Sequence, residues 1–117
     1  MPNIQLKRIY EPAASSDGFR VLVDRLWPRG VSKERAHLDL WAKNISPSTA
    51  LREAYHSGGY TFAEMQKIYR AELAKNPAVD DFVKTIAKKK TVTLLTATKD
   101  IGHAYVADIV HALKKKM

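Results

Sequence analysis

Two short loops in the sequence combine positive charge with turn-forming residues. Residues 24–30 (DRLWPRG) and residues 96–100 (TATKD) each come directly after a stretch that we interpret as a buried strand. If these strands are parallel, both loops open at the same edge of a sheet, where α/β proteins bind their ligands. Arg25, Arg29 and Lys99 would then lie together beside a helix N-terminus, and guanidinium groups and free N–H groups both bind phosphate or carboxylate. The loops therefore predict an anion-binding site.

A structural role is the alternative for the same charges. Arg25 could pair with Asp24 or Asp100 and so clasp the two loops together, because ion pairs that only support the fold also gather charges in clefts. In that case the loop residues would lock the fold and leave no donor open to a ligand.

Two histidines are candidates for moving a proton. His103 lies in the first turn of the last predicted helix, where the helix dipole favours a neutral imidazole that could act as a general base near Lys99. His56 lies at a predicted helix C-terminus, where the dipole favours a positive charge. For both residues the alternative is a polar side chain that takes no part in chemistry.

Other kinds of site find no support in the sequence. Cysteine is absent, which excludes a disulfide framework, a thiolate zinc site and a thiol nucleophile. No two of the four histidines have the i, i+4 spacing of a helical metal site with a third ligand nearby, so we predict no metal. No Walker loop, dinucleotide-binding glycine pattern or G-x-S-x-G elbow occurs, and the sequence identifies no cofactor.

The elements that must position these residues can be predicted from apolar periodicity and capping residues. Alternation over residues 4–9 indicates a strand, for which a sheet edge is one option, and apolar, β-branched runs indicate buried strands at 19–24 and 91–97. Residues 40–45 are ambiguous, and we interpret them as a strand. Predicted helix starts are Ser32 for a short turn, Ser46-Pro47 for a helix to about Tyr55, the capping box Thr61–Glu64, Asn76-Pro77, and Asp100 or Gly102 for the last helix.

This order of elements indicates the fold class. A central strand as apolar as residues 92–97 must be covered on both faces. We expect a single α/β domain over residues 1–117, a sandwich with a largely parallel central sheet of about four strands flanked by helices. The strand order cannot be read from the sequence, and neither can the oligomeric state.

The composition and the lengths of the apolar runs indicate where in the cell we expect the protein. The chain has 117 residues, of which 45% are hydrophobic, as in ordinary globular proteins. The longest apolar run, residues 92–97, is far too short to cross a bilayer, and the first residues lack the apolar stretch of a secretion signal. We expect a soluble cytoplasmic protein without a membrane partner.

The formal net charge of +8 raises the question of a nucleic-acid partner. Six of the 20 basic residues are in Lys88–Lys90 and Lys114–Lys116, and without them 14 basic residues face 12 acidic ones. Both runs end predicted helices, so solvated helix ends are the simpler interpretation. In the alternative, these runs and Lys84 form one exposed stripe of a nucleic-acid or protein-binding module. No aromatic residue interleaves with the runs, which argues against base stacking.

A run of ten residues supports a family resemblance. Residues 21–30 (VLVDRLWPRG) resemble the signature of the domain-of-unknown-function 488 family, in its bacterial YeaO-like branch. The resemblance extends over most of the chain, including Trp41, Tyr69 and the stretch 93–95. It implies a compact α/β fold and a small cytoplasmic prokaryotic protein, but it implies no settled activity.

The resemblance also selects polar residues. The motif positions of the family correspond here to Asp24, Arg25, Arg29, Lys43, Arg52, His56, Lys99, Asp100 and His103. Their excess of positive charge agrees with the anion-binding interpretation. We therefore expect a small anionic ligand, bound by a sensor or an enzyme. The expected ligand-binding residues are Arg25, Arg29, Arg52, Lys99, Asp24 and Asp100, and the expected proton-transfer residues are His103 and His56.

Overall fold

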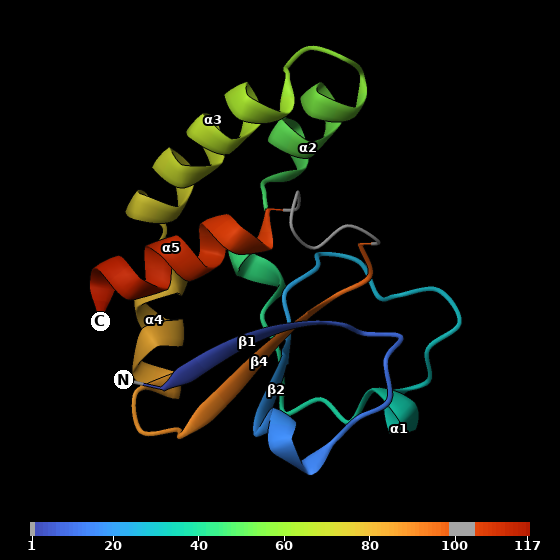
Figure 1. Ribbon diagram of the computed structural model, residues 1–117. Coiled ribbons are helices and arrows are strands. Elements are labelled where there is room, and N and C mark those ends of the chain that lie inside the picture. The colour runs from blue at the N-terminus through green and yellow to red at the C-terminus, as the bar shows by residue number, and fades with distance from the viewer. Residues whose placement is uncertain (1, 99–104) are drawn as a thin grey trace.

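A four-stranded parallel sheet lies at the centre of the computed structural model, which describes residues 2–98 and 105–117 (Figure 1). Within these residues the strand order is β1-β4-β2-β3, and each neighbouring pair is parallel. The expected α/β fold with a parallel sheet is confirmed. The strands are β1 (Asn3–Arg8), β2 (Phe19–Leu22), β3 (Leu40–Trp41) and β4 (Thr91–Thr96).

The two central strands carry the two loops singled out in the sequence. Strand β2 pairs with β4 in a register that places Leu22 opposite Leu95, and the Val23 N–H donates to the Leu95 carbonyl at 3.1 Å. Because the strands are parallel neighbours, residues 24–30 and the chain after Thr96 leave the same edge of the sheet. Strand β1 occupies a sheet edge, which agrees with one of the options for it.

Four of the five helices in the described residues begin at a residue whose side chain caps them. The helices are α1 (Lys33–Ala36), α2 (Thr49–His56), α3 (Phe62–Lys75), α4 (Pro77–Ile86) and α5 (Val106–Lys116). Ser32 accepts a hydrogen bond from the Arg35 N–H, and Thr61 and Glu64 form the predicted capping box. Asn76 caps α4, with Pro77 as its first residue.

Two predicted boundaries were wrong. The strand expected over residues 40–45 ends at Trp41, because the chain then leaves the sheet through a 3₁₀ turn, η2 (Lys43–Ile45). Helix α2 is capped by Ser48 and not by Ser46. The Ser46 hydroxyl donates instead to the Lys43 carbonyl at 2.6 Å, which completes the 3₁₀ turn. The predicted starts of the last helix, Asp100 and Gly102, lie outside the described residues.

Both faces of the sheet are covered. Val21, Val92 and Leu94 point toward the larger core, which also contains buried residues of α2 to α5. Leu22 and Leu95 point to the opposite face, where loops and α1 form a smaller cluster. Alternate residues of β2 and β4 thus enter different cores, as central parallel strands require. Among the described residues, none of the helices has the length and apolar character that spanning a membrane requires.

Candidate functional site

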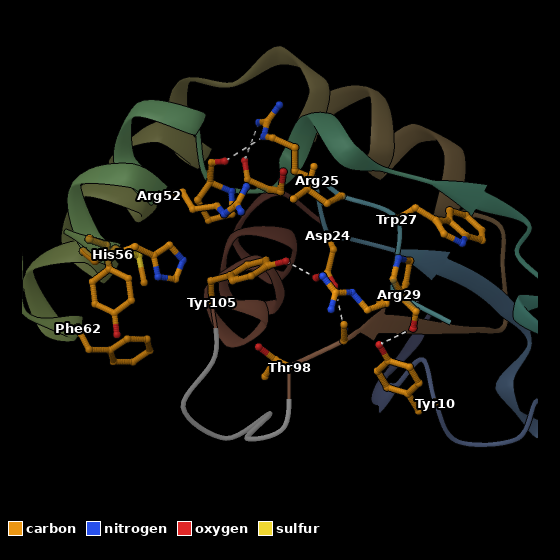
Figure 2. Close-up of a pocket in the computed structure, with 17 residues that line it drawn as sticks. Tyr10, Asp24, Arg25, Trp27, Arg29, Arg52, His56, Phe62, Thr98 and Tyr105 are labelled. Atoms are coloured by element: carbon orange, nitrogen blue, oxygen red, sulfur yellow. Dashed lines mark hydrogen bonds between the residues drawn. The ribbon is translucent and has the colours of Figure 1, made fainter. Parts of the chain in front are cut away.

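A cavity of about 580 Å³ lies at the carboxyl edge of β2 and β4 (Figure 2). It is bounded by the loop after β2, by α2, by the first turns of α3, by the end of β4 and by the residue before α5. The described residues that line it are Tyr10, Asp24, Arg25, Leu26, Trp27, Pro28, Arg29, Ser46, Pro47, Arg52, Tyr55, His56, Phe62, Met65, Ala97, Thr98 and Tyr105.

Five of the eight residues expected at a site line this one cavity: Asp24, Arg25, Arg29, Arg52 and His56. The remaining three, Lys99, Asp100 and His103, lie outside the described residues. Lys43, which the family resemblance also selected, does not line the cavity, and its ammonium group lies 5.0 Å from the centroid of the Trp41 ring.

Asp24 connects the two loops through hydrogen bonds. One carboxylate oxygen accepts from the Thr96 hydroxyl at 2.7 Å and from the Tyr105 hydroxyl, and the other accepts from the Ala97 N–H at 2.8 Å. This single side chain therefore joins the ends of β2 and β4 to the residue that precedes α5. Both of its oxygens are already occupied by donors of the protein.

Tyr105 is the partner of Asp24 that sequence reasoning missed. Burial, and then the negative charge of Asp24, raise the pKa of the Tyr105 hydroxyl far above its ordinary value, so it stays protonated and donates. Its ring packs edge-on against Tyr69, with centroids 5.8 Å apart. No local pattern marks Tyr105, because its role depends on β2 and β4 being neighbours.

Arg25 does not pair with Asp24. Its Nε donates to the Pro47 carbonyl at 3.3 Å and its Nη2 to the Ser46 carbonyl at 3.5 Å. Figure 2 shows this guanidinium directed toward the segment before α2 and away from Asp24. The ion pair between Arg25 and Asp24, which was one alternative from the sequence, is therefore absent. The other alternative, an ion pair between Arg25 and Asp100, lies outside the described residues.

Arg29 and Arg52 present guanidinium groups that are free within the described part of the chain. Neither side chain makes a hydrogen bond or ion pair with another described residue, although both line the cavity. The main-chain carbonyl of Arg29 accepts from the Tyr10 hydroxyl at 3.1 Å, which fixes this part of the loop. These two arginines can therefore bind an anion without first breaking an ion pair within the described structure.

Helix α2 brings several cavity residues to one face. Arg52, Tyr55 and His56 are spaced i, i+3 and i+4, so they lie together on the helix surface. Figure 2 shows Arg52 and His56 directed from α2 toward the side of the cavity where Tyr105 lies. The helix start is anchored by Glu72 of α3, whose carboxylate accepts from the Ser48 N–H at 3.2 Å and the Ser48 hydroxyl at 2.7 Å.

The cavity also has an apolar wall that was not recognised from the sequence. The rings of Tyr55 and Phe62 lie 6.2 Å apart, and the buried Met65 follows Phe62 by one helical turn. His56 is exposed at the rim, 5.6 Å from the ring of Tyr55. In the sequence these residues have the spacing of ordinary helix packing, so their position beside the arginines could not be foreseen.

A metal centre finds no support in the part of the chain that the structure describes. Residues 2–98 and 105–117 contain no group of three or more histidine, cysteine, aspartate or glutamate side chains placed to hold a metal ion. The described residues that line the cavity offer guanidinium groups, an imidazole, one carboxylate, hydroxyls and aromatic surface.

Comparisons with known proteins extend over almost the whole chain. A family model described as "Inactive DUF488-N3 subclade" matches residues 3–117. Uncharacterized protein YeaO of Escherichia coli (strain K12) is 47% identical over 114 residues, which cover 95% of this chain and 99% of that protein. Uncharacterized protein Rv3073c of Mycobacterium tuberculosis (strain ATCC 25618 / H37Rv) is 34% identical over 110 residues, which cover 94% of this chain and 92% of that protein. No solved structure matches the chain significantly.

Proposed function

The chain belongs to the domain-of-unknown-function 488 family, and on that premise we propose that it binds a small anionic ligand in the cavity at the carboxyl ends of β2 and β4. The observation that carries this proposal is the pair of guanidinium groups, Arg29 and Arg52, which line the cavity without a described partner.

The charge balance of the cavity supports an anion. Three arginines line it, and Asp24 is the only acidic residue among its described lining. The single negative charge of Asp24 offsets at most one of the three arginines, and both of its oxygens already accept hydrogen bonds from the protein. A phosphate or carboxylate can bind each guanidinium through two parallel, charge-assisted hydrogen bonds.

The apolar wall indicates the rest of the ligand. Tyr55, Phe62 and Met65 offer aromatic and thioether surface opposite the charged loop. Ligand pockets of about 300–1,000 Å³ commonly combine such surface with a few polar groups that set the orientation. We therefore expect a ligand that joins an anionic group to a flat, apolar body.

Binding without turnover is the favoured form of this function. The matching subclade is described as inactive, and Asp24 is engaged in holding the loops together. The protein would then act as a sensor or carrier. In the enzymatic alternative, His56 or His103 would transfer a proton to the bound anion. A cytoplasmic location stays a prediction from the sequence.

Calorimetric titration with phenyl phosphate, inorganic phosphate and phenol tests the proposal. We expect phenyl phosphate to bind more tightly than inorganic phosphate, and phenol to bind weakest, because only phenyl phosphate contacts both the arginines and the apolar wall. Arg52→Gln removes a charged donor worth about 1.5–3 kcal/mol, so phenyl phosphate affinity should fall about tenfold or more.

The matched control is Arg35→Gln, which removes the same charge from α1, away from the cavity. It should leave the affinity unchanged. Equal affinity of Arg52→Gln and the parent chain for phenyl phosphate would disprove the proposed site. Steady release of inorganic phosphate from phenyl phosphate would instead favour the enzymatic alternative.

A further inference from the structure

The two lysine runs lie on the side of the molecule that is remote from the cavity. Helix α4 leads through Lys88–Lys90 into the start of β4, where the Asn3 N–H donates to the Lys90 carbonyl at 2.9 Å. In Figure 1 the connection from α4 to β4 and the C-terminal end of α5 lie on the same side, next to the N-terminus. The cavity is at the opposite ends of the strands, so the lysine runs belong to a separate surface.

One face of α4 links the two lysine runs. Asp80 and Lys84 are four residues apart, and Lys88 follows four residues later, beyond Ala87, which keeps helical backbone angles. Residues at this spacing share one helix face, in steps of about 6 Å. Lys116 of α5 donates to Asp80 at 2.8 Å, so the end of α5 lies beside the beginning of this row.

This lysine surface, which comprises Lys84, Lys88–Lys90 and Lys114–Lys116, carries most of the excess charge of the chain. It holds seven lysines, against Asp80 and Asp81 in the first half of α4. Of the seven, Lys116 pairs with Asp80 and Lys89 lies 4.8 Å from the centroid of the Phe19 ring. The other five make no side-chain hydrogen bond or ion pair with a described residue, and all five are exposed.

From this arrangement we propose that the lysine surface binds the phosphate backbone of double-stranded nucleic acid, independently of base sequence. Lysine supplies a point charge that contacts phosphate, whereas base recognition commonly uses bidentate arginine or stacked aromatic rings, and the surface contains neither. A membrane surface fits less well, because the apolar face of α5, with Val106, Ile109 and Leu113, is buried in the core.

Fluorescence anisotropy with a labelled duplex DNA of about 20 base pairs, and with duplex RNA of the same length, tests this inference. Each phosphate contact releases counterions, so the logarithm of the affinity should fall linearly with the logarithm of salt, by about 0.9 per contact. The triple variant Lys84→Gln/Lys88→Gln/Lys115→Gln should flatten this slope by about 0.9 for each lysine in contact.

The control variant Lys33→Gln/Arg35→Gln/Lys67→Gln removes the same number of charges from α1 and α3. It should keep the slope of the parent chain. Absence of duplex binding at about 50 mM salt, or equal weakening in both triple variants, would overturn the inference. Binding to phosphatidylserine vesicles without binding to duplexes would overturn it as well.

The cavity and the lysine surface can be tested separately. Arg52→Gln should leave duplex affinity unchanged within about twofold, and the lysine triple variant should titrate phenyl phosphate like the parent chain. Failure of either proposal therefore leaves the other standing.

Discussion

Asp24 shows how one side chain can hold together the segments that bound a cavity. Its carboxylate accepts from Thr96, Ala97 and Tyr105, which belong to segments more than 70 residues further along the chain. The family resemblance selected Asp24 as a ligand-binding residue. Its hydrogen bonds lead us to assign it a positioning role at the mouth of the cavity.

Tyr105→Phe tests the link between Asp24 and α5. Loss of the hydroxyl leaves a partly buried carboxylate with one donor fewer, and a hydrogen bond to a charged group contributes about 1.5–3 kcal/mol. We expect the free energy of unfolding, measured by urea denaturation, to fall by an amount in that range. Tyr60→Phe, at an exposed tyrosine, is the control and should unfold like the parent chain. Identical denaturation curves for all three proteins would show that the hydroxyl contributes nothing.

Asp17 provides a prediction about pH. Burial acts to raise the pKa of this carboxyl, but hydrogen bonds from Ala14, Lys7 and Arg20 outweigh it and hold the pKa below its ordinary value of 3.8. A group whose pKa is lowered by folding stabilises the fold above its unfolded pKa, and this contribution is lost as the pH falls through the folded pKa. Stability should therefore decrease on acidification below about pH 4.

The Asp17 prediction can be checked directly by an NMR titration of the side-chain carboxyl carbon. Its midpoint should lie below 3.8. A midpoint at or above 3.8 would contradict the hydrogen-bond network that the structure places around Asp17.

At the scale of elements, α2 depends on a contact with another helix. The helix has eight residues and only Leu51 is buried, so packing alone anchors it weakly. Glu72 of α3 accepts two hydrogen bonds from Ser48, the cap of α2, and thereby fixes the helix that carries Arg52 and His56.

Glu72→Ala should both destabilise α2 and lower the affinity of the cavity for phenyl phosphate. Removal of the carboxylate costs two hydrogen bonds to a charged group, each worth about 1.5–3 kcal/mol, so we expect a loss of about 3 kcal/mol or more in unfolding free energy and weaker binding of phenyl phosphate. Ser32→Ala removes the cap of α1, which does not line the cavity, so it should cost about 1 kcal/mol without changing affinity. If Glu72→Ala binds phenyl phosphate like the parent chain, Glu72 does not position the site.

Elements set by local signals could be predicted, and elements set by distant partners could not. The capping box at Thr61 and the Asn76-Pro77 boundary depend on neighbours within a few residues, and both were identified. The start of α2 depends on Glu72, which lies 24 residues after Ser48, so the sequence favoured Ser46 instead. The strand predicted over residues 40–45 exists as β3, but its end at Trp41 was not predicted, because the chain then turns into η2.

Over the whole molecule, strand order decides which residues share a site. The apolar runs indicated a parallel sheet but gave no order, and the loops after β2 and β4 meet only because these two strands are neighbours. The arginines and His56 could therefore be identified from the sequence, but their neighbours Tyr105, Phe62 and Met65 could not be predicted. The same topology places the cavity and the lysine surface at opposite ends of the strands.

The central claim is that the arginines at the carboxyl edge hold an anion. An NMR titration of the ¹⁵N-labelled chain with phenyl phosphate, following backbone amides and arginine Nε–H signals, tests it most directly. Our account predicts saturable shifts of the Arg29 and Arg52 Nε–H signals and of amides in residues 24–30 and 49–56, with Lys88–Lys90 unchanged. Shifts confined to the lysine surface, or no saturable shift at all, would contradict it.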